Sequence, residues 1–165
     1  MEKPLNTSNV FYTGKFKKRF TKHTTSIDVI GIDTEADRNG KCFMIATSEN
    51  DVFPPDRLLE KLKSRTYRGK KFVAYNLKYD MGALLQIFPY ETLQELREND
   101  KAIFGEWTIR VIANKMISFK YKHHVCEIFD MYNFYMGSLN SNAEKYLGKK
   151  KIDLNPEQFT QEYIS

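Results

Sequence analysis

Two carboxylates separated by a single residue, Asp33 and Glu35, are the first side chains in the sequence whose spacing suits catalysis. They come directly after an apolar, strand-like run at 29–32. Side chains two residues apart on a strand point to the same face, so these carboxylates would repel each other unless a cation lies between them. An Asp-x-Glu pair also arises by chance, and a charged strand end is usually solvated. Its place at the end of an apolar strand favours a metal site.

A second polar cluster, Asn76 to Asp80 with the sequence NLKYD, follows the strand-like run KFVAY at 71–75. Asp80 falls in the first turn of a predicted helix, where the helix dipole stabilises an anion, and the Asn76 amide can both donate and accept hydrogen bonds. Helix capping alone would account for either residue. Acids at the ends of two core strands instead favour Mg²⁺ or Mn²⁺, which prefer carboxylate oxygens. The two clusters together predict phosphoryl chemistry.

The elements that must position these groups alternate between strand and helix. Strands are predicted at 27–33, 42–48, 71–75, 107–112, 116–121 and 125–129. Helices are predicted from Pro54 onward, at 79–88, 93–97 and 139–147, and from Asn155 to the end. The helix at 139–147 is expected to have Ser138 as its N-cap and Gly148 as its C-terminal stop. The first strand is expected to be covered on both faces, and the runs 107–112 and 116–121 to form an inserted hairpin. This pattern predicts an α/β fold with a mixed sheet flanked by helices.

The charge of the chain is concentrated at its beginning. Residues 1–25 carry six Lys and Arg and one acid, whereas the remaining 140 residues carry 20 charges of each sign, for a net charge of +5. We expect a basic N-terminal arm at 1–25, which either contacts the body or an anionic partner or is simply solvated, and one folded domain at 26–165. With 41% hydrophobic residues, wholesale disorder is excluded.

The sequence has no apolar run of the roughly 18 residues that a membrane span requires, and no apolar stretch typical of a secretory signal. We therefore expect a soluble, intracellular protein without a membrane partner. Cys42 and Cys126 lie in apolar runs without metal-binding spacing, which predicts two buried, reduced thiols. His123 and His124 are adjacent, which disfavours a joint metal site and predicts two surface side chains.

In their order along the chain, these motifs resemble those of the DEDD 3′-5′ exonucleases. The motifs are Asp33-Thr34-Glu35, Asn76 with Tyr79-Asp80, Asp130 followed by Ser138-Leu139, and Tyr163. The likeness covers about residues 27–165 and is closest to the proofreading exonuclease domain of family B DNA polymerases of the viral, organellar or protein-primed kind. It implies an RNase H-like fold and hydrolysis of phosphodiester bonds at single-stranded DNA 3′ ends by two Mg²⁺ or Mn²⁺ ions, ~3.5 to 4 Å apart.

The resemblance also implies a role for each matched residue. Asp33 would bridge both ions, Glu35 and Asp80 would complete one ion's shell or position the water, and Tyr163 would orient the attacking water. The residues implied to bind the 3′ end or line its channel are Asn76, Tyr79, Ser138 and Leu139. Lys149, in a basic cluster that ends at Lys151, would contact phosphates or belong to a solvated turn. Asp130 would be a carboxylate near the metals or a hydrogen-bond acceptor at a strand end.

The third motif of these exonucleases is Tyr-x-x-x-Asp, and counted from Tyr163 its Asp would fall just beyond Ser165. We therefore expect either a fragment of a longer protein, with a polymerase domain downstream in the same chain, or a protein that lacks the fourth ligand. The second case predicts a catalytically weak or inactive module that binds nucleic acid or a protein. A third hypothesis is an RNase H-like nuclease that cuts internally.

Overall fold

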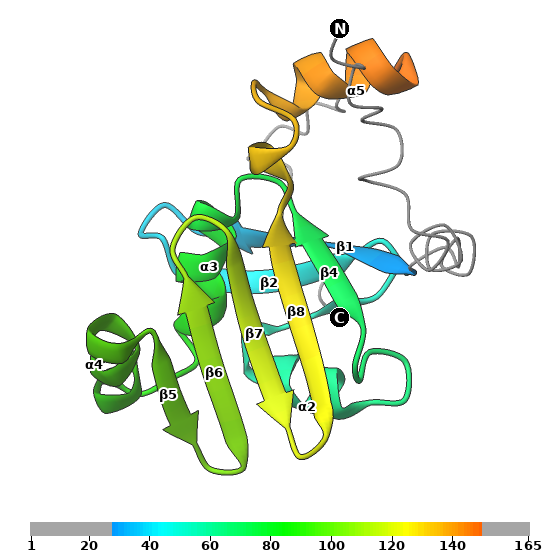
Figure 1. Cartoon of the computed structure of the whole chain (residues 1–165). Helices are drawn as coiled ribbons and strands as arrows, with labels where there is room; N and C mark the ends of the chain where they lie inside the picture. The colour runs from blue at the N-terminus through cyan, green and yellow to red at the C-terminus, as the bar shows by residue number, and fades with distance from the viewer. Residues whose placement is uncertain (1–27, 150–165) are drawn as a thin grey trace, which may run out of the picture.

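The computed structural model describes residues 28–149, and they form a mixed α/β fold around one sheet (Figure 1). The strands in the described residues are β1 (Val29–Ala36), β2 (Cys42–Thr47), β3 (Val52–Phe53), β4 (Lys71–Ala74), β5 (Lys101–Phe104), β6 (Trp107–Ile112), β7 (Met116–Tyr121) and β8 (His124–Asp130). Their spatial order is β3-β2-β1-β4-β8-β7-β6-β5. The predicted hairpin of β6 and β7 is confirmed to the residue.

Three strands at the centre of the sheet, β1, β4 and β8, run parallel to one another. Their carboxyl ends therefore meet at the same edge. The register pairs Ala74 with Asp130, so the last residues of β4 and β8 lie side by side. Asp33 and Glu35 lie in the carboxyl-terminal half of β1, the cluster at 76–80 follows β4, and Asp130 is the last residue of β8. Ligands of open α/β sheets commonly bind at this edge.

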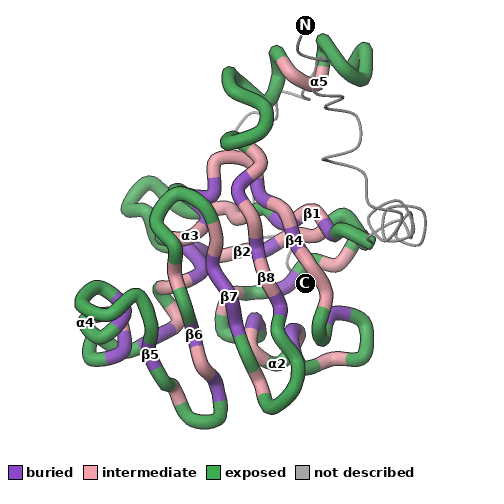
Figure 2. Tube along the Cα trace, in the orientation of Figure 1, coloured by how far each residue is buried: buried purple, intermediate pink, exposed green. Residues whose placement is uncertain are grey.

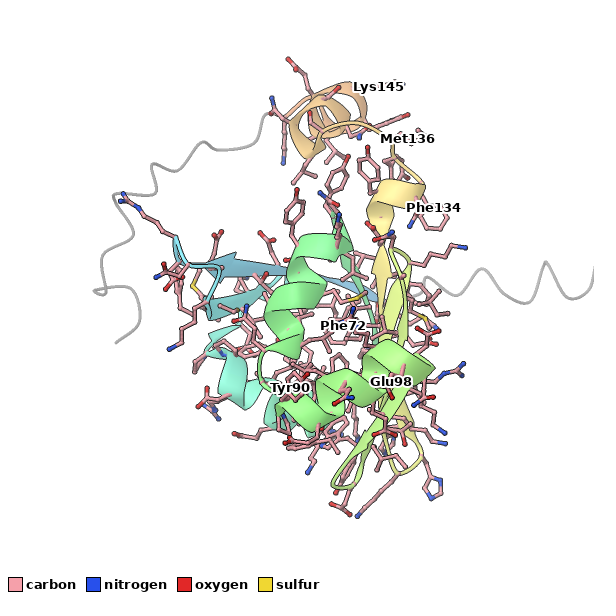
Figure 3. All side chains as sticks on the ribbon, turned by 90° about the vertical axis from the view of Figure 1, so that its left-hand side faces the viewer. Phe72, Tyr90, Glu98, Phe134, Met136 and Lys145 are labelled. Atoms are coloured by element: carbon pink, nitrogen blue, oxygen red, sulfur yellow. The ribbon has the colours of Figure 1, made fainter. Side chains whose placement is uncertain are left out.

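The helices described are η2 (Pro55–Arg57), α2 (Leu58–Lys63), α3 (Leu77–Leu85), α4 (Tyr90–Asn99), η3 (Met131–Asn133) and α5 (Leu139–Leu147). Helices α2 and α3 lie on one side of the sheet, and α4 packs beside β5 (Figures 1 and 3). Between this layer and the sheet lies the core, which is purple in Figure 2 and includes Ile45, Leu77 and Ile128, all fully buried. Each such side chain stabilises the fold by about 1.5 to 3 kcal/mol.

The opposite side of the sheet carries no helix within residues 28–149, as the uncovered strands β4, β8, β7 and β6 show in Figure 1. The prediction that β1 is covered on both faces is therefore wrong for the part of the chain that the structure describes. Ile30 and Ile32 face the core, but the other face of β1 carries Gly31 and Asp33, and Val29 is 45% exposed. A glycine and a carboxylate do not provide a second apolar face.

Several other boundaries differ from the predicted ones. Helix α3 begins at Leu77, two residues before the predicted start, directly after the left-handed Asn76, and α4 is longer than the predicted 93–97. The short strands β3 and β5 were not predicted. The basic arm at 1–25, the helix from Asn155 and Tyr163 lie outside the described residues. No helix of residues 28–149 combines the length and the apolar character needed to cross a membrane.

Candidate active site

Asp80 joins the first turn of α3 to β1. Its Oδ1 accepts hydrogen bonds from the Thr34 backbone N–H (3.0 Å) and from the Thr34 hydroxyl (2.7 Å). The pairing of β1 with β4 ends at Gly31, so beyond that point the Asp80 carboxylate serves as the partner of the Thr34 N–H. Asp80 is only 4% exposed, which fixes its orientation at the carboxyl end of β1.

Burial raises the pKa of Asp80 to about 6, and the negative charge of Asp33 contributes to this rise. The two hydrogen bonds from Thr34 act in the opposite direction because they stabilise the charged form. The exposed Asp33 is therefore close enough to the buried Asp80 to raise the pKa of the Asp80 carboxyl. A cation between them would favour the ionised form of both.

A cavity of about 1270 Å³ lies over the carboxyl ends of β1 and β4, below α5. Its lining includes six of the predicted site residues: Asp33, Asn76, Tyr79, Asp80, Ser138 and Leu139. Typical small-molecule sites measure about 300 to 1,000 Å³, so this cavity is large enough for more than a small ligand. The structure thus brings together residues that are up to 106 positions apart in the sequence.

Aromatic and apolar side chains that line this cavity remain accessible to solvent. Tyr79 is 75% exposed, and Tyr146 and Leu147 of α5 are 58% and 70% exposed. Helix α5 has no buried residue, as its green and pink trace in Figure 2 shows. Contiguous exposed apolar surface marks interaction sites, and these three side chains line one cavity.

Helix α5 is held over the cavity through Tyr75, at the end of β4. The Tyr75 Oη donates to the Gly137 carbonyl (2.6 Å), and the Asn142 Nδ2 donates to the Tyr75 Oη (2.7 Å). As predicted, Ser138 is the N-cap of α5, with its Oγ accepting from the Ser141 N–H (3.0 Å). The segment between β8 and α5 also carries the exposed side chains Phe134 and Met136, labelled in Figure 3.

Asp130 ends β8 and connects two turns. Its Oδ1 accepts hydrogen bonds from the backbone N–H groups of Asn76 (3.1 Å) and Tyr132 (2.8 Å), and the residue is 4% exposed. Asn76 has a left-handed backbone with φ 64°, so the Asp130 carboxylate stabilises the turn that presents α3 to the cavity. Of the two alternatives for Asp130, the structure shows the strand-end acceptor.

Other predicted residues lie apart from this arrangement. Glu35 is half-buried on β1 and is not part of the cavity lining, and Lys149 is exposed just after α5 and also lies outside the lining. Residues 28–149 contain no group of three or more His, Cys, Asp or Glu side chains that could hold a metal ion. The cavity lining therefore contains Asp33 and Asp80 but not Glu35.

The chemistry of the two carboxylates in the cavity fits a divalent ion. Magnesium in proteins is usually held by one or two carboxylates and completes its shell with water and substrate phosphates. Asp33 and Asp80 come from separate elements and supply hard oxygen ligands to the same cavity, and the charge of Asp33 adds to the effect of burial in raising the pKa of Asp80. No cysteine adds a soft ligand, because Cys42 and Cys126 are free and buried, as predicted.

Thr34 and Tyr75 are residues whose roles sequence reasoning missed. Thr34 stands between the two predicted acids, and the alternation of a strand places it on the opposite face from both, toward α3. That signal was available in the sequence. Nothing in the sequence indicates that the Tyr75 hydroxyl contacts the segment before α5, 62 residues later.

Comparisons of the chain with protein families, with curated proteins and with solved structures each found no match.

Proposed function

We propose that this chain is a metal-dependent 3′-5′ exonuclease domain of an RNase H-like fold, acting on single-stranded DNA ends as the proofreading module of a DNA polymerase. The observation that carries the proposal is the pairing of Asp33 and Asp80 in one large cavity at the carboxyl ends of β1 and β4. The parallel strands β1, β4 and β8 with an inserted hairpin support the fold part of the proposal.

In this proposal Asp33 and Asp80 hold the metal ions. When bound, a pair of divalent ions would stabilise the negative charge on the attacking and leaving oxygens of a phosphodiester. Side chains alone stabilise this charge poorly. The hydrogen bonds from Thr34 keep the Asp80 Oδ1 in a fixed position, which leaves the rest of its carboxylate for the ion.

The walls of the cavity suit an unstacked nucleic-acid strand. Tyr79 on α3 and Tyr146 on α5 are exposed aromatic rings on two elements that line the same space. Bases stack on such rings at about 1 to 3 kcal/mol each without regard to sequence. A single-stranded 3′ end therefore fits the site better than a duplex, whose bases are already stacked.

The direct test is Mn²⁺-dependent release of mononucleotides from a 3′-labelled single-stranded oligonucleotide, both by the 165-residue chain and by a protein that extends past Ser165. Asp33→Asn is expected to abolish the release, whereas Glu49→Gln, which removes an exposed charge outside the cavity, is expected to leave it unchanged. Release that survives Asp33→Asn would refute the assignment. Cutting of circular single-stranded DNA would instead identify an enzyme that cleaves internally.

A second candidate function is a non-catalytic nucleic-acid-binding module. It is favoured by the absence of a third metal-binding carboxylate beside Asp33 and Asp80 among residues 28–149. This alternative predicts salt-dependent binding of single strands without turnover at any Mn²⁺ concentration.

A further inference from the structure

A group of basic side chains gathers at the end of the sheet opposite the cavity. It comprises Lys63, Arg65, Arg68, Lys70, Lys120 and Lys122, with His123 and His124, and we call it the basic end. Residues 28–149 as a whole are almost neutral, with 18 Lys and Arg against 17 Asp and Glu. The stretches 63–70 and 120–124 contain no acid, so the basic end reflects an uneven distribution of charge and not the average composition.

Contacts between the two stretches show that they form one surface. The Lys63 Nζ lies 4.3 Å and the Lys122 Nζ 5.2 Å from the centre of the Tyr121 ring. A Cβ built on Gly69 would lie 4.0 Å from the His124 Nδ1, and the Glu127 N–H donates to the Lys70 carbonyl (3.4 Å). The loop before β4, at the lower right of Figure 1, therefore lies beside the first half of β8, which begins at the turn at the bottom of that view.

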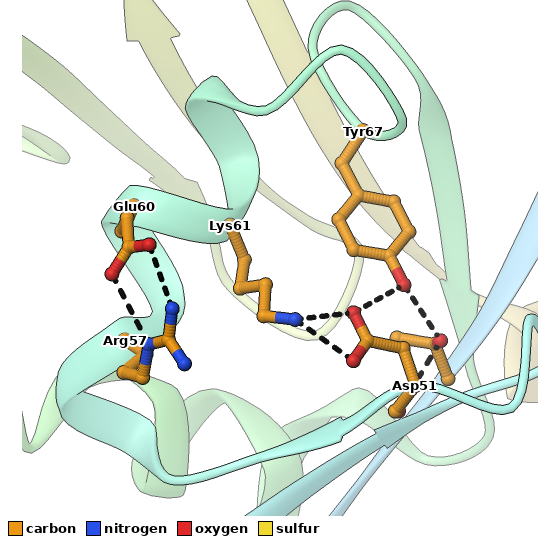
Figure 4. Close-up of polar contacts among 6 residues, drawn as sticks. Asp51, Arg57, Glu60, Lys61 and Tyr67 are labelled. Atoms are coloured by element: carbon orange, nitrogen blue, oxygen red, sulfur yellow. Dashed lines mark hydrogen bonds and ion pairs between the residues drawn. The ribbon is translucent and has the colours of Figure 1, made fainter.

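The loop that carries Arg65 and Arg68 is held rigidly by Tyr67 between them. Tyr67 is 2% exposed, and its hydroxyl donates to the Asp51 Oδ2 (2.9 Å), which also accepts from Lys61 (Figure 4). The Tyr67 carbonyl accepts from the Cys126 Sγ (3.2 Å). These contacts fix the backbone of the loop, whereas both arginine side chains are exposed and make no hydrogen bond or ion pair with other described residues.

The acids beside the basic end leave most of its charge uncompensated. Asp51 is paired with Lys61 and Glu127 with Lys71, neither of which belongs to the basic end. Asp28 pairs with Lys70 at 3.4 Å, and Glu106 accepts a hydrogen bond from the Tyr121 hydroxyl (3.1 Å). Lys63 and Lys122 lie near the same ring and repel each other, and an anion near both would relieve this repulsion. A polyanion with regularly spaced charges fits this arrangement better than a single small anion, because the cations are spread over two segments.

We propose that the basic end binds the phosphate backbone of nucleic acid, as a second contact surface separate from the cavity. The choice of nucleic acid as the polyanion rests on the proposed function. The seven residues of β8 (His124–Asp130) separate the two surfaces by roughly 20 Å, at about 3.3 Å per residue. Neither 63–70 nor 120–124 carries an exposed large apolar side chain, which would anchor a membrane-binding surface.

The test measures binding of the full chain to a dumbbell DNA duplex, which has no 3′ end, by fluorescence anisotropy without divalent metal. In the variant Arg65→Gln/Arg68→Gln/Lys122→Gln we expect affinity at least ~10-fold weaker at 50 mM salt and a salt slope smaller by about 2.7, since each lost phosphate contact removes about 0.9. The control Arg97→Gln/Lys101→Gln/Arg110→Gln removes the same charge from exposed residues elsewhere and should leave the slope unchanged.

Two further measurements separate this inference from its alternatives. Hydrolysis of a trinucleotide, too short to reach both surfaces, should be equal in the wild type and in the basic-end variant. Failure of that hydrolysis in the wild type counts against the proposed function and not against the basic end. Any of three results would overturn the inference. The two triple variants could show equal salt slopes, or the wild type could fail to bind the dumbbell. The third is tighter binding to anionic phosphatidylserine vesicles than to DNA, if that binding depends on Arg65, Arg68 and Lys122.

Discussion

The buried carboxyl of Asp80 makes a quantitative prediction about stability. Its pKa rises from 3.8 to about 6 on folding, mainly through burial and also through the charge of Asp33. Because one pKa unit corresponds to about 1.4 kcal/mol, ionised Asp80 destabilises the metal-free fold by about 3 kcal/mol. Asp80→Asn keeps an oxygen that can accept from Thr34 but removes this charge, so the variant should be more stable than the wild type at pH 7.5.

The pH dependence follows from which state holds the proton. Between about pH 4 and pH 6 the folded protein keeps a proton on Asp80 that the unfolded chain has lost, so the wild type loses stability as the pH rises through this range. The advantage of Asp80→Asn should therefore be near zero at pH 4 and grow to about 3 kcal/mol above pH 6. Divalent metal should reverse the order, because it stabilises the wild type through binding.

Urea denaturation of the full chain measures the difference in the free energy of unfolding between the wild type and Asp80→Asn from pH 4 to pH 8. It is measured first in chelator and then in about 10 mM Mn²⁺, a concentration sufficient for a weak site. Glu49→Gln, at an exposed position in the turn before β3, serves as the control. If Asp80→Asn is no more stable than the wild type at pH 7.5 in chelator, or if Glu49→Gln shows the same pH-dependent gain, the reasoning about the buried charge is refuted.

Three further substitutions test the contacts around the cavity. Thr34→Val removes the hydroxyl donor to Asp80 and should raise the pKa of Asp80 further. The pH at which Mn²⁺ binding reaches half its maximum, measured by calorimetry, should therefore move upward, and an unchanged midpoint contradicts this. Tyr75→Phe removes the hydroxyl that holds the segment before α5 and should cost about 1 kcal/mol, speed amide exchange at 134–147 and raise KM more than it lowers kcat. Amide exchange at 134–147 equal to that of the wild type would show that Tyr75 does not hold α5. Asp130→Ala leaves two backbone N–H groups without their acceptor and should cost about 3 kcal/mol in urea denaturation, whereas Mn²⁺ affinity of the folded variant stays the same. Loss of Mn²⁺ binding there would make Asp130 a metal ligand.

The sequence indicated which strand ends carry the acids that line the cavity, because those signals are local. Asp33 and Asp80 each follow an apolar run, and the parallel strands β1 and β4 bring such strand ends to one edge of the sheet. The N-cap Ser138 and the left-handed Gly148 at the end of α5 were predicted for the same reason, since caps depend on residue type and immediate neighbours.

Other features depend on tertiary contacts that no local pattern shows. The period of a strand placed Glu35 on the same face as Asp33, but the cavity does not extend to it. Strand β5 (Lys101–Phe104) has mixed residue types and forms only because it pairs with β6 beside α4. Helix α3 starts early because Leu77, fully buried, fixes its first turn in the core.

The central claim is that Asp33 and Asp80 hold a divalent ion together. Crystals of the protein soaked in Mn²⁺ and measured at the manganese absorption edge locate such an ion directly. The account predicts an anomalous peak in the cavity about 2 Å from carboxylate oxygens of both residues, and none there in Asp80→Asn crystals. An empty cavity, or a peak bound only to other carboxylates, would contradict it.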